Sequence, residues 1–241
     1  VGTDAGGGYD SYGRALGAHI GRHIPGNPNV VVQNMPGASG LKATNYIYNS
    51  APKDGSVLGA VNSQMTLQPL FTSQGVQFDP FKLNWLGTMG KQLNLCLTWH
   101  TSPVKTIQDA QQREATVAAT SASGAYALVP NILNAVIHTK FKVISGYDTA
   151  GSNLAVERGE VDGLCGISYS TLMTSNPNWV TDKKINLLTE LGMGRDPRFP
   201  NMPMAIDMVT DPADKKMLEV ILVVQEVGRP IVAPGWMSIP V

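Results

Sequence analysis

Residues 6–10 read Gly6-Gly7-Gly8-Tyr9-Asp10 and open into a run in which Tyr12, Leu16, Ile20 and Ile24 recur at helical spacing. Three successive glycines place no Cβ in the turn, so its backbone N–H groups can approach a ligand closely. The N-terminus of the following helix carries about half a positive charge and several N–H donors without helical partners. The stretch therefore predicts an anion-binding turn or, as the alternative, a glycine-rich turn that only reverses the chain.

The same order of strand, small-residue turn and helix recurs in the first third of the chain. A β-branched run predicts a strand at 29–33. It leads through Asn34-Met35-Pro36-Gly37-Ala38-Ser39-Gly40 into a helix expected at 41–49. A further short strand, expected at 56–61, ends in the small polar side chains of Asn62-Ser63-Gln64. This repetition indicates a second glycine turn beside the first.

A third turn of this kind lies in the middle of the sequence. The strand expected at 116–119 leads through Thr120-Ser121-Ala122-Ser123-Gly124-Ala125-Tyr126 into a helix expected at 127–138. The unit then repeats through a strand at 141–145 and the turn 146–152, which contains Tyr147. A tyrosine at such a turn can line a cleft and offer its hydroxyl, although burial in the core is the alternative.

This alternation predicts an α/β protein with a mostly parallel sheet in each of two lobes, of the two-lobed, Venus-flytrap kind found in periplasmic binding proteins. The break at Gly90 and the returning helix expected at 213–228 predict a discontinuous first lobe, 1–90 plus 225–241, and a second lobe, 91–224. Because no helix follows to close the first lobe, we expect the protein to continue past Val241.

Composition excludes several classes of function. Eighteen basic and eighteen acidic residues balance, so no overall field would recruit nucleic acid or an anionic membrane. The longest apolar run, 220–224, is too short to span a bilayer, and nothing at the N-terminus reads as a signal peptide. The chain is therefore expected to be either cytoplasmic or without its leader. Cys96 and Cys165 fit no metal or redox spacing, and we expect two buried free thiols rather than a disulfide.

No motif predicts a cofactor, a metal site or a catalytic group. The glycine turn lacks the dinucleotide spacing, and no P-loop is present. Ser121 or Ser123 beside Gly124 could serve a hydrolase, but no nucleophile-elbow motif accompanies them. His19 and His23 lie one helical turn apart, a spacing that could bind metal, but without a nearby Glu partner we interpret them as part of a solvated helix face. Catalysis is unsupported by these patterns.

For two aspartates, a structural role is the alternative to ligand binding. Asp10 and Arg14 are four residues apart, which indicates a local ion pair, and a carboxylate aimed at an anion would repel it. Asp162 lies at the start of the strand expected at 161–167, where a structural role is favoured over a ligand contact.

Four motifs in this order resemble the substrate-binding proteins of tripartite tricarboxylate transporters, the Bug family, over nearly the whole chain: Gly6-Gly7-Gly8-Tyr9-Asp10 with Arg14, Asn34-Met35-Pro36-Gly37-Ala38-Ser39-Gly40, Ala51-Pro52-Lys53-Asp54-Gly55 and Gly159-Glu160-Val161-Asp162-Gly163. The resemblance implies a periplasmic receptor that closes on a small carboxylate in an interlobe cleft and delivers it to membrane transporter subunits. It implies no cofactor and no membrane-spanning segment of its own. The alternative is an α/β enzyme acting on a carboxylated small molecule in the same cleft.

The resemblance places carboxylate loops at residues 6–10 and 120–126, which the pattern of the residues had also marked. The candidate ligand-binding residues are Gly7, Gly8, Tyr9, Asp10, Pro36, Gly37, Ala38, Asn62, Ser63, Thr120, Ser121, Ser123, Gly124, Tyr126, Tyr147 and Asp162. Backbone amides and hydroxyls dominate this set, so the sequence predicts recognition of a carboxylate but does not identify the acid.

Overall fold

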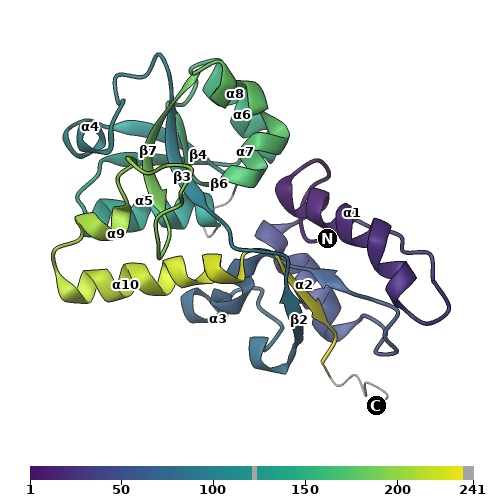
Figure 1. Ribbon diagram of the computed structural model, residues 1–241. Coiled ribbons are helices and arrows are strands. Elements are labelled where there is room, and N and C mark those ends of the chain that lie inside the picture. Colours follow the sequence, from purple (N-terminus) through teal and green to yellow (C-terminus); the bar gives the residue numbers. More distant parts are fainter. Residues whose placement is uncertain (121–123, 236–241) are drawn as a thin grey trace. The chain divides into compact units, whose positions relative to one another are not determined.

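The computed structural model describes residues 1–120 and 124–235, and its chain divides into two compact units. Unit 1 comprises Val1–Lys91 and the segment from Val227 onward, and unit 2 comprises Gln92–Glu226. The chain therefore passes from one unit to the other twice (Figure 1). Within the described residues, none of the helices has both the length and the apolar character needed to cross a membrane.

Unit 1 is built on a three-stranded sheet in the order β1-β8-β2. Its elements are α1 (Gly8–Ile20), η1 (Gly21–His23), η2 (Ala38–Gly40), α2 (Leu41–Asn49), β1 (Gly59–Ala60), η3 (Ser63–Thr66), α3 (Gln68–Phe71), η4 (Pro80–Lys82), β2 (Asn84–Thr88) and β8 (Pro230–Ala233). Leu41 and Ile47 of α2 pack with Val61, Met65 and Val232 to form its core.

The mostly parallel sheet expected for the first lobe is wrong, because β8 pairs antiparallel with both β1 and β2. The central strand comes from the far end of the sequence, and local alternation carries no information about such a partner. The strand expected at 29–33 is also absent from the described sheets. Instead, Val32 packs against α1, where a Cβ added to Gly17 would lie 2.7 Å from the Val32 side chain.

Unit 2 is built on a five-stranded sheet in the order β5-β4-β6-β3-β7. Its elements are β3 (Asn94–Trp99), α4 (Ile107–Gln112), β4 (Ala115–Ala119), α5 (Ala125–Val136), β5 (Phe141–Ser145), α6 (Thr149–Glu157), β6 (Gly163–Ser168), α7 (Tyr169–Ser175), α8 (Pro177–Thr181), β7 (Ile185–Leu191), α9 (Ala205–Met208) and α10 (Pro212–Val223), followed by η5 (Val224–Val227). Strand β4 is parallel to β5 and β6, whereas β3 is antiparallel to β6 and β7. The sheet is therefore mixed, with a parallel half.

Helices cover both faces of this sheet, which explains why its strands read as continuous apolar runs. Successive residues alternate between two cores, with Cys96, Val117 and Cys165 on one face and Leu97, Ala118 and Leu164 on the other. Side chains of α4, α5, α9 and α10 complete the first core, and those of α6, α7 and α8 complete the second (Figure 1). The α/β class predicted from the sequence is confirmed in this unit.

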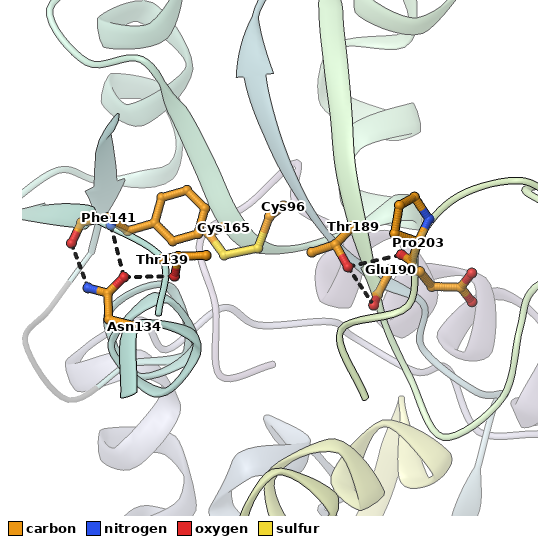
Figure 2. Close-up of a disulfide and its surroundings, with 8 residues drawn as sticks. All are labelled: Cys96, Asn134, Thr139, Phe141, Cys165, Thr189, Glu190 and Pro203. Carbon is orange, nitrogen blue, oxygen red and sulfur yellow. Dashed lines mark hydrogen bonds between the residues drawn. A yellow bond between two sulfur atoms is a disulfide. The ribbon is translucent and has the colours of Figure 1, made fainter. Parts of the chain in front are cut away.

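Cys96 and Cys165 form a disulfide between β3 and β6 (Figure 2). The expectation of two free thiols is therefore wrong. The two cysteines are directly opposite each other in the antiparallel register of β3 and β6, and both are fully buried. Spacing along the sequence did not reveal this pairing, because it depends on the register of strands whose cysteines are 69 residues apart.

Candidate functional site

Among the described helices of six or more residues, the residue before the first turn separates two classes. Helices α1, α2 and α5 follow Gly7, Gly40 and Gly124, residues with no side chain that could cap the helix. By contrast, the first turns of α4, α6, α7 and α10 are capped by the side chains of Thr106, Asp148, Ser168 and Asp211. The three glycine-capped helices are those that follow the three turns predicted from the sequence. Among the described helices of six or more residues, these three are the ones whose N-cap residue makes no side-chain cap hydrogen bond; the shorter helices α3, α8 and α9 lack one too.

Asp10 stabilises the first turn through the hydrogen bonds that its carboxylate accepts. Its carboxylate accepts hydrogen bonds from the Gly6 backbone N–H and the Arg14 Nε at 2.9 Å each, and from the Asn34 side chain at 2.8 Å. Burial by itself raises the pKa of Asp10, but the bonds from Arg14, Gly6 and Asn34 outweigh it and lower the pKa to about 2. The ion pair expected between Asp10 and Arg14 is present, and the carboxylate is turned onto the protein.

Tyr9, the second residue of α1, is fixed within unit 1 by its hydroxyl. The oxygen accepts a hydrogen bond from the Ser63 backbone N–H at 3.0 Å and lies 3.1 Å from the Gly228 carbonyl oxygen, to which it donates. The guanidinium of Arg229 lies over its ring, with Cζ 4.1 Å from the ring centroid. The hydroxyl that we expected Tyr9 to offer is therefore already engaged by the protein.

The second turn lies beside the first in unit 1. Gly37, Ala38, Ser39 and Gly40 take positive φ angles of 142°, 46°, 56° and 101° in succession. Asn62 supports this turn, because its side-chain amide donates to the Ser39 carbonyl at 3.3 Å. The next residue, Ser63, bonds to Tyr9, so the structure brings the first turn, the second turn and the 62–63 segment together. Pro36 immediately precedes the second turn.

In unit 2 the candidate residues gather at one edge of the sheet. Because β5, β4 and β6 are adjacent and parallel, their carboxyl ends meet there. The backbone N–H groups of Gly146 and Tyr147 both donate to the carbonyl of Ala119, the last residue of β4. Thr120, Gly124 and Tyr126 follow β4, and Tyr147 follows β5. Ser121 and Ser123 lie outside the described residues.

Asp162 lies at the opposite end of β4. Its carboxylate accepts hydrogen bonds from the backbone N–H and hydroxyl of Thr116, both at 2.8 Å, and from the Ser102 hydroxyl at 2.9 Å. Thr116 is the second residue of β4, whereas Thr120 follows the last. The structure therefore gives Asp162 a structural role and does not bring it together with the other unit 2 candidates.

Sequence reasoning missed residues in both units. Arg229, which is 3% exposed, had no local signal beyond its place between Gly228 and Pro230. Ser168 and Tyr169 mark the carboxyl end of β6, beside the ends of β4 and β5. The passage from an apolar strand through hydroxyl residues into a helix could have identified them, since it repeats the pattern of the other turns without the glycines. Among the described residues, no group of three or more His, Cys, Asp or Glu side chains could hold a metal ion.

Residues 21–221 of the chain match the family model of tripartite tricarboxylate transporter family receptors. A search of curated proteins found no match. Similar solved structures include Rpa4515 of R. palustris with adipate, at 17% identity and a TM-score of 0.72, covering 98% of this chain and 87% of that one. They also include MatC (Rpa3494) from Rhodopseudomonas palustris with bound malate, at 19% identity and a TM-score of 0.73, covering 98% and 77%.

The periplasmic binding protein BugD is similar at 16% identity and a TM-score of 0.71, covering 92% of this chain and 80% of that one. Likenesses at this level of identity establish the fold. They confirm the α/β, periplasmic-binding-protein-like class predicted from the sequence.

Proposed function

Because this chain belongs to the family of tripartite tricarboxylate transporter receptors, we propose that it captures a small carboxylate outside the cytoplasm and delivers it to the membrane subunits of such a transporter. In this proposal the protein binds and releases the acid without chemical change. The observation that carries the proposal is the capping pattern. Each unit contains a helix of at least twelve residues, α1 or α5, that begins at a glycine without a side-chain cap. Such a helix N-terminus favours an anion.

The energetics of such a site suit a transport receptor. About four charge-assisted hydrogen bonds from backbone amides, at roughly 1.5 to 3 kcal/mol each, supply about 6 to 12 kcal/mol before the ordering of ligand and protein is subtracted. A net free energy near −8 kcal/mol corresponds to micromolar affinity, which allows both capture and release. The relatives Rpa4515 and MatC, with adipate and malate in their structures, support small carboxylates as the first ligands to try.

We place the protein in the periplasm. The disulfide between Cys96 and Cys165 supports this location, because disulfides persist in oxidising compartments and are rare in the cytosol. The relative BugD is itself a periplasmic binding protein.

The test begins with a thermal-shift screen of mono-, di- and tricarboxylates and aromatic acids, followed by calorimetry on each acid that raises the melting temperature. Mass spectrometry of the recovered acid distinguishes a receptor from an enzyme, since a receptor returns it unchanged. A wild-type protein that binds none of these acids, or that converts one of them, contradicts the proposal.

Gly7→Val locates the site. Gly7 has φ −80° and ψ 172°, a conformation open to any residue, and a Cβ added there would come no closer than 3.8 Å to its nearest neighbour, the Asp4 carbonyl. The variant is therefore expected to fold while blocking close approach to the N-terminus of α1, and to weaken carboxylate binding at least tenfold. Gly194→Val, in unit 2, is the control for the glycine-to-valine change itself, because an added Cβ there meets no atom within 4 Å. Unchanged affinity in folded Gly7→Val would remove the first turn from the site.

A further inference from the structure

Arg229 reaches from the start of β8 to the first turn of α1. Its backbone is fixed to the end of β2, because its N–H donates to the Thr88 hydroxyl and its carbonyl accepts from the Met89 N–H, both at 3.1 Å. Its side chain is buried, and the guanidinium carbon lies 4.1 Å from the Tyr9 ring centroid and 5.4 Å from that of Tyr12. A guanidinium over an aromatic face is attracted by the negative potential of the ring, more strongly when desolvated.

Tyr9 is thereby held at two places. Its hydroxyl is fixed by the Ser63 N–H and the Gly228 carbonyl, and the face of its ring is fixed by Arg229. Because Tyr9 directly follows Gly7 and Gly8, fixing its side chain also restricts the turn whose backbone N–H groups would meet a ligand. Three glycines otherwise give this turn more conformational freedom than other residues would.

The positive charge of Arg229 and the partial positive charge at the N-terminus of α1 both attract an anion. The N-terminus of α1 carries a partial positive charge, and the Arg229 guanidinium beside it is a cation. The neighbouring carboxylate, Asp10, is already hydrogen-bonded to Gly6, Arg14 and Asn34. A buried cation beside a positive helix end is a favourable arrangement for binding an anion.

We infer that Arg229 is the positioning residue of the first glycine turn: through the face of Tyr9 it holds the turn in its anion-binding conformation, and its charge strengthens the attraction of the turn for a carboxylate. This inference rests on the proposed function and adds to it a residue that determines the affinity of the same site. Arg229 acts on the face of the Tyr9 ring, whereas Ser63 and Gly228 hold the Tyr9 hydroxyl.

The first experiment needs no ligand. Hydrogen exchange followed by mass spectrometry is measured on the wild type, Arg229→Met and Arg229→Lys, with the exposed Arg22→Met as the control in the same unit. In Arg229→Met, exchange in peptides covering residues 4–12 should accelerate about tenfold, with unit 2 peptides unchanged. Arg229→Lys should show a smaller acceleration and Arg22→Met none. Unchanged exchange at residues 4–12 in Arg229→Met would overturn the inference. Should that variant not fold, Arg229→Lys and Tyr9→Leu provide the same comparison.

The second experiment measures affinity for adipate and malate by calorimetry at several salt concentrations. Arg229→Met should weaken binding about tenfold and reduce its salt dependence, whereas Arg229→Lys should keep the salt dependence and recover part of the affinity. In a Tyr9→Leu background, Arg229→Met should have little further effect on affinity beyond the loss of charge. An equal loss in both backgrounds, with salt dependence unchanged, would show that Arg229 does not act through Tyr9.

The two experiments separate this inference from the proposed function. If the wild type binds no carboxylate, the proposed function fails, and the exchange rates alone then decide whether Arg229 orders the turn. If the wild type binds but the Arg229 variants match it in both assays, the inference fails and the proposed function stands.

Discussion

Replacing Asp10 by asparagine should destabilise unit 1 by an amount that depends on pH. The bonds from Arg14, Gly6 and Asn34 lower the pKa of Asp10 from its ordinary value of 3.8 to about 2 in the folded protein, against the opposing effect of burial. A difference of just under two pKa units, at about 1.4 kcal/mol per unit, corresponds to roughly 2 to 2.5 kcal/mol of stability. Because the folded state holds the ionised form more strongly, this contribution is fully present above the unfolded pKa. It is lost as the pH falls from 3.8 through about 2.

The assay is urea unfolding of the wild type and Asp10→Asn between pH 2 and pH 7. At pH 7 the variant should be about 2 kcal/mol less stable, which moves the urea midpoint by about 1 M if the denaturant slope is about 2 kcal/mol per M. The difference should stay constant down to about pH 5 and then shrink. Asp4→Asn is the control, since Asp4 is an exposed carboxylate in the same segment. Equal stability at pH 7, or a deficit of the same size at pH 2, would refute the assignment of Asp10 as the carboxylate that stabilises the turn.

Two further predictions concern the buried groups of unit 2 in Figure 2. Glu190 is fully buried, one of its carboxylate oxygens lacks a hydrogen-bond partner among the described residues, and desolvation raises its pKa. Glu190→Gln should therefore be more stable than the wild type by about 1 to 3 kcal/mol at pH 7 to 8. Urea titrations should show this gain shrinking as the pH falls through the raised folded pKa of Glu190 toward 4.5, below which the wild-type group is protonated in both states. A gain that does not change with pH would contradict this account. Cys96→Ser/Cys165→Ser should lose up to about 4 kcal/mol relative to the oxidised wild type, because the disulfide closes a loop across 69 residues, and the loss should vanish when both proteins are measured in reductant.

What the sequence predicted well was local. The turns at residues 6–10, 34–40 and 120–126 combine glycine with a following helical pattern, and each precedes a helix with a glycine N-cap. The strand expected at 141–145 coincides with β5, since a short apolar strand between turn residues depends little on distant partners. The ion pair of Asp10 and Arg14 follows from helical spacing alone.

What the sequence did not reveal depends on distant partners. The direction of β8, the pairing of the two cysteines and the contact of Arg229 with Tyr9 each join segments that no local pattern connects. The hydrogen-bond partners of Asp162 were not foreseen for the same reason, because Ser102 and Thr116 lie in other segments of unit 2. The site residues themselves remain predictions for which the variants above are the test.

The placement of β8 also bears on the order in which the chain can fold during synthesis. Unit 2 is one continuous segment, Gln92–Glu226, so all of its strands are synthesised before β8. Unit 1 has its central strand at Pro230–Ala233, and Gly59 and Trp85 both pair with Val232 in that strand. Residues 1–91 must therefore wait, with the edges of β1 and β2 unpaired, until β8 (Pro230–Ala233) is synthesised. Non-local pairing of this kind is slow and exposes strand edges to aggregation, so the first glycine turn is expected to become ordered last.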